Sequence, residues 1–195
     1  MTKIKICGLR TLADIDAANE TGPDYVGFVL SPGYRRSISL AQALTLRRAL
    51  APGIVPVGVF VQAKSEFIQS CIDCGAIEVV QFHGNETPAD CAAVHGAKTI
   101  KAFVSGETPP APPEAYPVDY LLFDSGRGDG IAPNQRTLPP CRKPFFLAGG
   151  LQAQNLKETL TAFSPYGVDI SSAAETHGVK DRNKMKQLVR SVHHE

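Results

Sequence analysis

Short apolar segments recur along the chain at a nearly constant spacing. Eight of them begin 21 to 31 residues apart, and several are runs of β-branched residues with few charges. They cover residues 3–7, 24–30, 55–61, 77–83, 98–104, 119–124, 144–150 and 167–172. Continuous apolar runs of this length are typical of parallel strands that are buried on both faces. The pattern therefore predicts eight parallel strands.

Helix signals fill most of the intervals between these strands. Thr11 opens the sequence Thr-Leu-Ala-Asp, Ser39 opens a capping box, and Thr87 precedes a proline at the first helical position. Apolar residues at helical spacing predict a last helix over 185–192. Two intervals differ: 105–117 contains five prolines, and 125–143 is rich in glycine, proline and polar residues. Neither favours a full helix.

Eight strands with intervening helices predict one (β/α)8 barrel, or TIM barrel, that spans residues 1–195 as a single compact domain. Its fifth and sixth helices are expected to be short or missing. An open doubly wound sheet is the alternative, although that fold usually has fewer strands. The length of 195 residues lies just under the lower end of the barrel's usual range, roughly 200 residues.

Composition narrows the class of protein. The 20 basic and 19 acidic residues give a net charge of +1, whereas binding to a nucleic-acid backbone needs a local basic excess. There is no apolar run of 18 residues, so we expect no membrane span. Met1 leads at once into the first strand, and five irregularly spaced cysteines do not resemble a secreted disulfide framework. A cytoplasmic protein is expected.

The pair Cys71 and Cys74 has the spacing of a redox or zinc motif. However, no second pair and no nearby histidine pair completes a set of four ligands. Cys71 also shares a helical face with Phe67, Ile68 and Ile72, which favours a role in core packing. We therefore expect no metal site.

Polar residues gather at the predicted carboxyl ends of the strands, where barrel active sites form. They are Cys7, Arg35, Arg36, Gln81, His83, Asp124, Gly149, Gly150, Asp169, Ser171 and Ser172. Each has a structural alternative: the cysteine as a small buried residue, the aspartate as a turn cap, the histidine as a packed side chain. Their shared location nevertheless favours a site.

Gly149 and Gly150 precede a predicted helix over 152–163, so their amides can face an anion. Ser171 and Ser172 add hydroxyl and amide donors on the next loop. The loops after strands 7 and 8 of such barrels often bind phosphate. We therefore expect a phosphorylated small-molecule ligand that is held by backbone dipoles.

Cys7 and Asp124 are expected to face each other across the barrel mouth, because they end strands 1 and 6. A thiol and a carboxyl on opposite sides of one substrate can act as general base and general acid. The thiolate form requires electropositive surroundings. Arg36 is then available to bind a substrate carboxylate through two hydrogen bonds.

Seven segments together carry a resemblance to a known family. They are Lys-Ile-Cys-Gly at 5–8, Val-Gly-Phe at 26–28, Val-Gly-Val-Phe at 57–60, Gln-Phe-His-Gly at 81–84, Leu-Phe-Asp-Ser at 122–125, Ala-Gly-Gly-Leu at 148–151 and Val-Asp-Ile-Ser-Ser at 168–172. In this order they resemble the phosphoribosylanthranilate isomerases of tryptophan biosynthesis. The resemblance runs nearly from end to end.

The resemblance implies a specific reaction. N-(5-phosphoribosyl)anthranilate would undergo an Amadori rearrangement to 1-(2-carboxyphenylamino)-1-deoxyribulose 5-phosphate, without cofactor or metal. Asp124 would protonate the ribose ring oxygen, and Cys7 would remove the proton from C2. Arg36 would lie near the anthranilate carboxylate. Gly149, Gly150, Ser171 and Ser172 would bind the phosphate, while Gln81, His83 and Asp169 would line the mouth.

The chain departs from the family pattern after Asp124. The family usually has Gly-Gly-Ser/Thr-Gly and then Phe-Asp-Trp, whereas residues 126–133 read Gly-Arg-Gly-Asp-Gly-Ile-Ala-Pro. Asp129 would repel a phosphate unless it points away, and Arg127 could pair with one. After Ser172 the usual glycine is replaced by Ala173, with Glu175 retained.

Two other functions remain open at this point. One is the histidine-pathway isomerase that performs the same rearrangement on another phosphosugar, although that enzyme is longer and typically has an aspartate where Cys7 stands. The other is a weakened relative that only binds phosphorylated ligands. Whether the protein is a monomer or a homodimer is not determined by the sequence.

Overall fold

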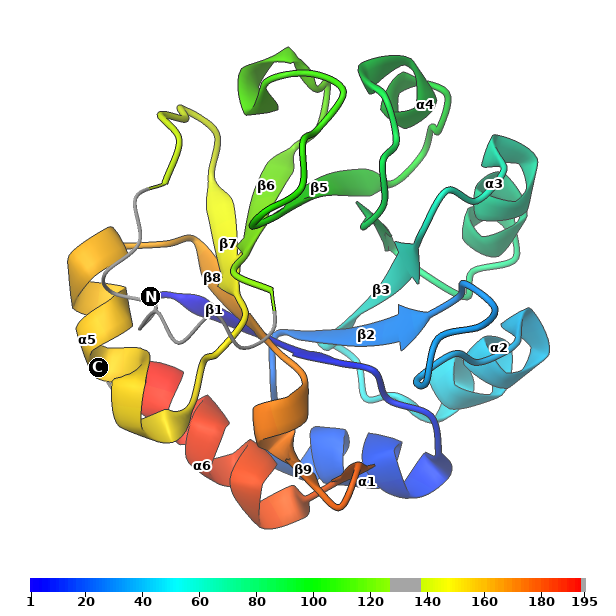
Figure 1. Ribbon diagram of the computed structural model, residues 1–195. Coiled ribbons are helices and arrows are strands. Elements are labelled where there is room, and N and C mark those ends of the chain that lie inside the picture. The colour runs from blue at the N-terminus through cyan, green and yellow to red at the C-terminus, as the bar shows by residue number, and fades with distance from the viewer. Residues whose placement is uncertain (127–137, 194–195) are drawn as a thin grey trace.

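Eight parallel strands close into a barrel in the computed structural model, which describes residues 1–126 and 138–193 (Figure 1). In chain order around the ring they are β1 (Lys3–Cys7), β2 (Tyr25–Val29), β3 (Val55–Phe60), β4 (Val79–Phe82), β5 (Lys98–Val104), β6 (Tyr120–Asp124), β7 (Phe145–Ala148) and β8 (Gly167–Ile170). β1 pairs with β8 in the register Lys3 to Gly167, which closes the ring. The predicted barrel is confirmed, and the open sheet is wrong.

Helices pack around the outside of the barrel (Figure 1). They are α1 (Leu12–Thr21), α2 (Leu40–Ala49), α3 (Ser65–Asp73), α4 (Pro88–Ala92), α5 (Ala153–Phe163) and α6 (Arg182–His193). Thr11, Ser39 and Thr87 each accept a hydrogen bond from the amide three residues on, and that residue's side chain bonds back to the cap. These capping boxes satisfy donors that a helix leaves free at its first turn.

Between β5 and β6 the described chain forms only a short 3-10 turn, η1 (Pro113–Ala115). The prolines of this stretch lack the amide hydrogen that a helix needs. The expected loss of the fifth helix is thus confirmed. The predictions about the sixth helix, Arg127 and Asp129 fall on residues 127–137, which lie outside the described residues.

The segment after β8 differs from a simple strand-to-helix loop. A 3-10 turn, η3 (Ser172–Ala174), leads into a small antiparallel hairpin of β9 (Glu175–Thr176) and β10 (Val179–Lys180). Arg10 donates a hydrogen bond to the carbonyl of Gly178 at 3.0 Å, and Lys184 donates to that of Glu175 at 2.7 Å. These two bonds connect the hairpin to the loop after β1 and to α6.

The strands separate two apolar cores. Outward-facing residues such as Ile4, Ile6 and Phe28 pack against the helices. Inward-facing residues fill the barrel, and they include Val57, Ile100, Leu122, Phe146 and, near the amino ends of the strands, Tyr25, Tyr120 and Tyr166. Because side chains alternate between the two faces of a strand, every second residue points inward. The polar inward-facing residues lie closer to the carboxyl ends.

Cys71 is part of the outer core, as expected. Cys71 is fully buried against the strands, whereas Cys74 is exposed, so the two thiols face different surroundings. Over residues 1–126 and 138–193 there is no group of three or more His, Cys, Asp or Glu side chains that could hold a metal ion. In the same residues no helix is long and apolar enough to cross a membrane.

Candidate active site

The candidate residues lie at one end of the barrel. Cys7 and Asp124 are the last residues of β1 and β6, and His83 directly follows β4. Gly149 and Gly150 follow β7, and Ser171 and Ser172 follow β8. Since all eight strands are parallel, these positions share the carboxyl-end mouth that the sequence predicted.

A buried ion pair lies beneath Cys7. Lys5 stands two residues before it on β1, so both side chains point into the barrel. The Lys5 ammonium donates to both carboxylate oxygens of Asp169, each at 2.9 Å, and the Lys5 side chain has no exposed surface. Burial alone would lower the pKa of Lys5, but the charges of Asp169 and Cys7 raise it above its ordinary value. Lys5 therefore remains a cation inside the barrel.

Cys7 itself is partly exposed at the mouth. Burial of the thiol raises its pKa, and the positive charges of Lys5 and Lys180 oppose that rise while Asp169 adds to it. The net direction is upward. In this structure the thiol is therefore the dominant form at neutral pH, and the thiolate depends on its cationic neighbours.

His83 connects Gln81 to Asp124. Its Nδ1 lies 2.8 Å from Nε2 of Gln81, and its Nε2 lies 3.6 Å from Oδ2 of Asp124. Burial lowers the pKa of His83 more than the Asp124 and Asp169 charges raise it, so the imidazole is neutral at physiological pH. A Gln81 amide that donates to Nδ1 leaves the proton on Nε2, which faces Asp124.

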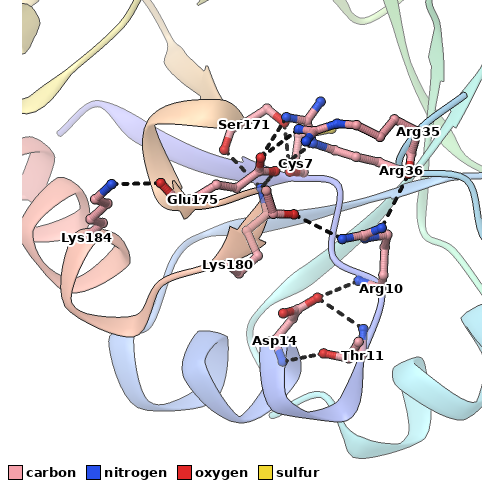
Figure 2. A network of polar contacts seen from close by, with 11 residues as sticks. Cys7, Arg10, Thr11, Asp14, Arg35, Arg36, Ser171, Glu175, Lys180 and Lys184 are labelled. Carbon is pink, nitrogen blue, oxygen red and sulfur yellow. Dashed lines mark hydrogen bonds and ion pairs between the residues drawn. The ribbon is translucent and has the colours of Figure 1, made fainter.

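Arg36 is fixed by Glu175, as Figure 2 shows. Nε and Nη2 of Arg36 donate to the two oxygens of Glu175 at 2.6 and 2.9 Å. Gly8, whose φ is +83°, makes room for this side chain, because a Cβ there would lie 2.3 Å from Cδ of Arg36. One edge of the guanidinium is thus occupied. The end formed by Nη1 and Nη2 keeps donors for a substrate carboxylate.

Three cations surround the Glu175 carboxylate (Figure 2). Besides Arg36, Arg35 donates to it at 2.8 Å and Lys180 at 2.9 Å. Burial would raise the pKa of Glu175, but hydrogen bonds from Arg36 and Lys180 lower it to about 2. One carboxylate against three cations leaves this side of the mouth electropositive. Such surroundings favour an anionic ligand and a thiolate at Cys7.

Both glycines that are predicted to bind phosphate lie in the left-handed region of backbone conformation. Gly149 and Gly150 have φ values of +80° and +66°, and the carbonyl of Gly150 accepts from Asn155 at 2.9 Å. The Ser171 hydroxyl donates to the carbonyl of Cys7 at 3.2 Å, whereas Ser172 is exposed. Ser171 therefore already has one partner, and Ser172 presents a free face to solvent.

Sequence reasoning missed the roles of Lys5, Glu175 and Lys180. Lys5 had a signal, because a lysine inside an apolar strand two residues before Cys7 must share its face. Lys180 lies in the irregular segment after β8, where no periodicity predicts which side chains turn inward. Glu175 matched the family pattern, but its contact with Arg36 required the structure.

The fold and the site together define a class: a (β/α)8-barrel protein with a thiol, a carboxyl–imidazole pair and a fixed arginine at the mouth. A family model described as N-(5'phosphoribosyl)anthranilate (PRA) isomerase matches residues 4–191. The chain belongs to this family of isomerases, as its sequence motifs suggested.

Individual relatives agree with this assignment. An N-(5'-phosphoribosyl)anthranilate isomerase of Lacticaseibacillus casei is 40% identical, over 98% of this chain and 95% of its own. The crystal structure of phosphoribosyl anthranilate isomerase from Thermus thermophilus is 34% identical, has a TM-score of 0.81 and covers 97% of this chain and 98% of its own. A third relative, a complex with reduced 1-(o-carboxyphenylamino)-1-deoxyribulose 5-phosphate, is 28% identical, has a TM-score of 0.80 and covers 98% of both chains.

Proposed function

We propose that this protein converts N-(5-phosphoribosyl)anthranilate to 1-(2-carboxyphenylamino)-1-deoxyribulose 5-phosphate by acid–base catalysis, as a step of tryptophan biosynthesis and without cofactor or metal. One observation carries the proposal: Cys7 and Asp124 end β1 and β6 at the same mouth, in a chain of this isomerase family. A phosphosugar Amadori rearrangement needs both a proton donor and a proton acceptor at such positions.

Asp124 begins the reaction. It gives a proton to the ribose ring oxygen, the bond from C1 to that oxygen breaks, and the nitrogen lone pair forms a C1=N iminium. Nε2 of the neutral His83 lies 3.6 Å from Oδ2 of Asp124, on the side of the mouth where the ring oxygen would receive the proton.

Cys7 completes the reaction. The thiolate takes the proton from C2, the C–H electron pair becomes the C1=C2 bond, and the C=N pair neutralises the nitrogen. The resulting enolamine tautomerises to the ketone. The iminium acidifies the C2 proton, so a thiolate is basic enough for this step. Among the cations around Glu175, Lys180 favours the thiolate because its charge lowers the pKa of Cys7.

Substrate binding divides between two sides of the mouth. The free end of the Arg36 guanidinium takes the anthranilate carboxylate. Backbone amides at Gly149 and Gly150, with Ser171 and Ser172, take the phosphate. Gln81, His83 and Asp169 line the sugar between them. Because these donors are mostly backbone groups, a chain with a net charge of +1 can hold a dianionic phosphate.

We further propose that the protein acts in the cytoplasm as a monomer or homodimer, with no nucleic-acid or membrane partner. One structural relative is described as a dimeric phosphoribosylanthranilate isomerase from Thermotoga maritima from which monomers were made. Sedimentation over a hundredfold range of protein concentration distinguishes the two states.

The test is turnover of freshly prepared substrate, followed by the loss of anthranilate-type fluorescence. We expect activity in the parent protein and a decrease of at least about a hundredfold in Cys7→Ala and Asp124→Asn, the usual cost of losing a general base or acid. Cys74→Ala is the matched control, because this thiol is exposed on the outer surface. Full activity in both site variants, or none in the parent, would contradict the proposal.

A further inference from the structure

One cation in the barrel has a role that the catalytic scheme has not used. Lys5 is completely buried, lies in the strand that ends at Cys7, and already satisfies both oxygens of Asp169. An ammonium has three N–H donors, so one remains after these two bonds. This spare N–H donor belongs to a buried cation beside Cys7, the base of the proposed reaction, so Lys5 can influence the ionisation of that thiol.

Gly27 creates the space in which Lys5 and Cys7 approach each other. It pairs with Cys7 in the register of β1 and β2. A Cβ at Gly27 would lie 2.6 Å from Sγ of Cys7 and 3.1 Å from Nζ of Lys5. Both atoms therefore border the same small volume, which any larger residue would fill.

We propose that Lys5 is a positioning residue whose ammonium, anchored by Asp169 and admitted by Gly27, is the fixed counter-charge of the Cys7 thiolate. This inference rests on the proposed function only in taking Cys7 as the base. When the thiolate takes the C2 proton it becomes a neutral thiol, and Lys5 stays paired with Asp169. Before the transfer Lys5 therefore faces two anions, Asp169 and the thiolate, and after it Lys5 faces Asp169 alone.

The other charges around Cys7 do not replace Lys5. From the hairpin, Lys180 faces the thiol but shares its charge with Glu175 at 2.9 Å, and Arg36 is held by the same carboxylate. From β8, Asp169 opposes the thiolate, and its charge is offset by Lys5. Lys5 is the one of these cations that is buried directly beneath the thiol on its own strand.

The experiment measures the thiolate directly. The full-length protein is alkylated with iodoacetamide at a series of pH values, and the modification of Cys7 is read by peptide mass spectrometry. We expect Lys5→Met to move the midpoint of Cys7 alkylation upward by at least about one pH unit, which is a tenfold loss of thiolate at neutral pH. Alkylation of the exposed Cys74 should not change, which controls for the reagent.

A second variant separates charge from structure. Lys5→Met leaves Asp169 buried without a partner, so it can destabilise the fold. Lys5→Met/Asp169→Asn removes both charges, and we expect the Cys7 midpoint in this variant also to exceed that of Asp169→Asn alone. The pH profile of kcat/KM should shift with the midpoint, so that activity recovers partly at higher pH.

The outcomes are distinct from those of the proposed function. An unchanged Cys7 midpoint in folded Lys5→Met, or in the double variant relative to Asp169→Asn, overturns the role of Lys5 even if turnover falls. A shifted midpoint in a protein that does not turn over the isomerase substrate supports Lys5 as the counter-charge and contradicts only the reaction.

Discussion

Glu175 is the carboxylate on which the cations beside Cys7 depend. Arg35, Arg36 and Lys180 all donate to it, and its own side chain is almost completely buried. Without that carboxylate the three positive charges would repel one another, and the Arg36 guanidinium would lose the two bonds that orient it. The residue therefore links the stability of this side of the mouth to substrate binding.

We predict that Glu175→Gln lowers the free energy of unfolding at neutral pH by about 3 kcal/mol, since it leaves buried cations unpaired. It should also raise KM, because Arg36 is no longer oriented. Urea unfolding followed by circular dichroism gives the first quantity and steady-state kinetics the second. Glu78→Gln is the control: it breaks a surface pair with Arg47, which is worth about 0.5 kcal/mol or less.

The contribution of Glu175 to stability has a defined pH dependence. The pKa of Glu175 is lowered from 4.5 to about 2, so its ionised form is stabilised in the folded state. Its contribution is fully present above pH 4.5 and is lost as the pH falls toward 2. The difference in unfolding free energy between the parent and Glu175→Gln should therefore shrink over that range. A difference that stays constant from pH 7 to pH 2 would show that the carboxylate's charge is not responsible.

At the residue scale the sequence identified the ends of the strands better than their interiors. Cys7, His83 and Asp124 were predicted at the mouth because each ends a recognisable apolar strand. Lys5 was not assigned a role, because the length of its side chain determines whether it reaches Asp169 on a strand more than 160 positions away in the sequence. That contact depends on ring closure between β1 and β8.

At the scale of elements, the close approach of the β6 and β7 loops depends on one glycine. Gly149 has a φ of +80°, and a Cβ there would lie 2.1 Å from Oγ of Ser125 and 2.8 Å from the Ser125 amide nitrogen. The hydroxyl of Ser125 is buried and has no hydrogen-bond partner within residues 1–126 and 138–193. The Ser125 backbone cannot move aside as a flexible side chain can. A Cβ at position 149 would therefore push the two loops apart.

We predict that Gly149→Ala destabilises the protein by about 3 kcal/mol and reduces turnover strongly, because strain and displacement of the Asp124 loop add to the cost of a positive φ. Gly53→Ala is the matched control. Its φ is +92°, and nothing lies within 4 Å of its Cβ position, so it should cost only about 1 to 2 kcal/mol and leave kcat unchanged. Thermal unfolding and kinetics on both variants test this, and equal effects would contradict the steric argument.

Element prediction succeeded where one physical signal dominated. All eight strands, the caps at Thr11, Ser39 and Thr87, and the missing helix before β6 follow from apolar runs, capping side chains and prolines. The hairpin of β9 and β10 was not predicted, because each strand has only two residues and its position depends on Arg10 and Lys184 from elsewhere in the chain.

At the scale of the whole molecule, both chain ends meet at one aspartate at the amino end of the barrel. Asp24 accepts from the Lys3 ammonium at 2.7 Å and from the Ile4 amide at 2.9 Å, and its Oδ2 lies 2.9 Å from Nε2 of His193 in α6. Burial would raise the pKa of Asp24, but these partners lower it. Asp24, which directly precedes β2, thus joins the first strand to the last helix at the end of the barrel opposite the candidate site.

This arrangement predicts that the order of the chain can change while the barrel stays intact. Residues 105–110 between β5 and η1 are exposed, and Pro109 and Pro110 have no amide hydrogen to lose from a ladder. A circular permutant that opens between Thr108 and Pro109, with the old termini joined by a glycine–serine linker of about six residues, should fold because the cut lies in an exposed loop and neither change interrupts a strand. We expect cooperative thermal unfolding and turnover within about tenfold of the parent, or 1.4 kcal/mol in activation free energy.

The control permutant opens between Ile100 and Lys101 inside β5. Both residues are buried and each forms a register pair with β6, so this permutant should not fold. If the two permutants behaved alike, the proline-rich segment would be contributing more to the barrel than a connection between two strands.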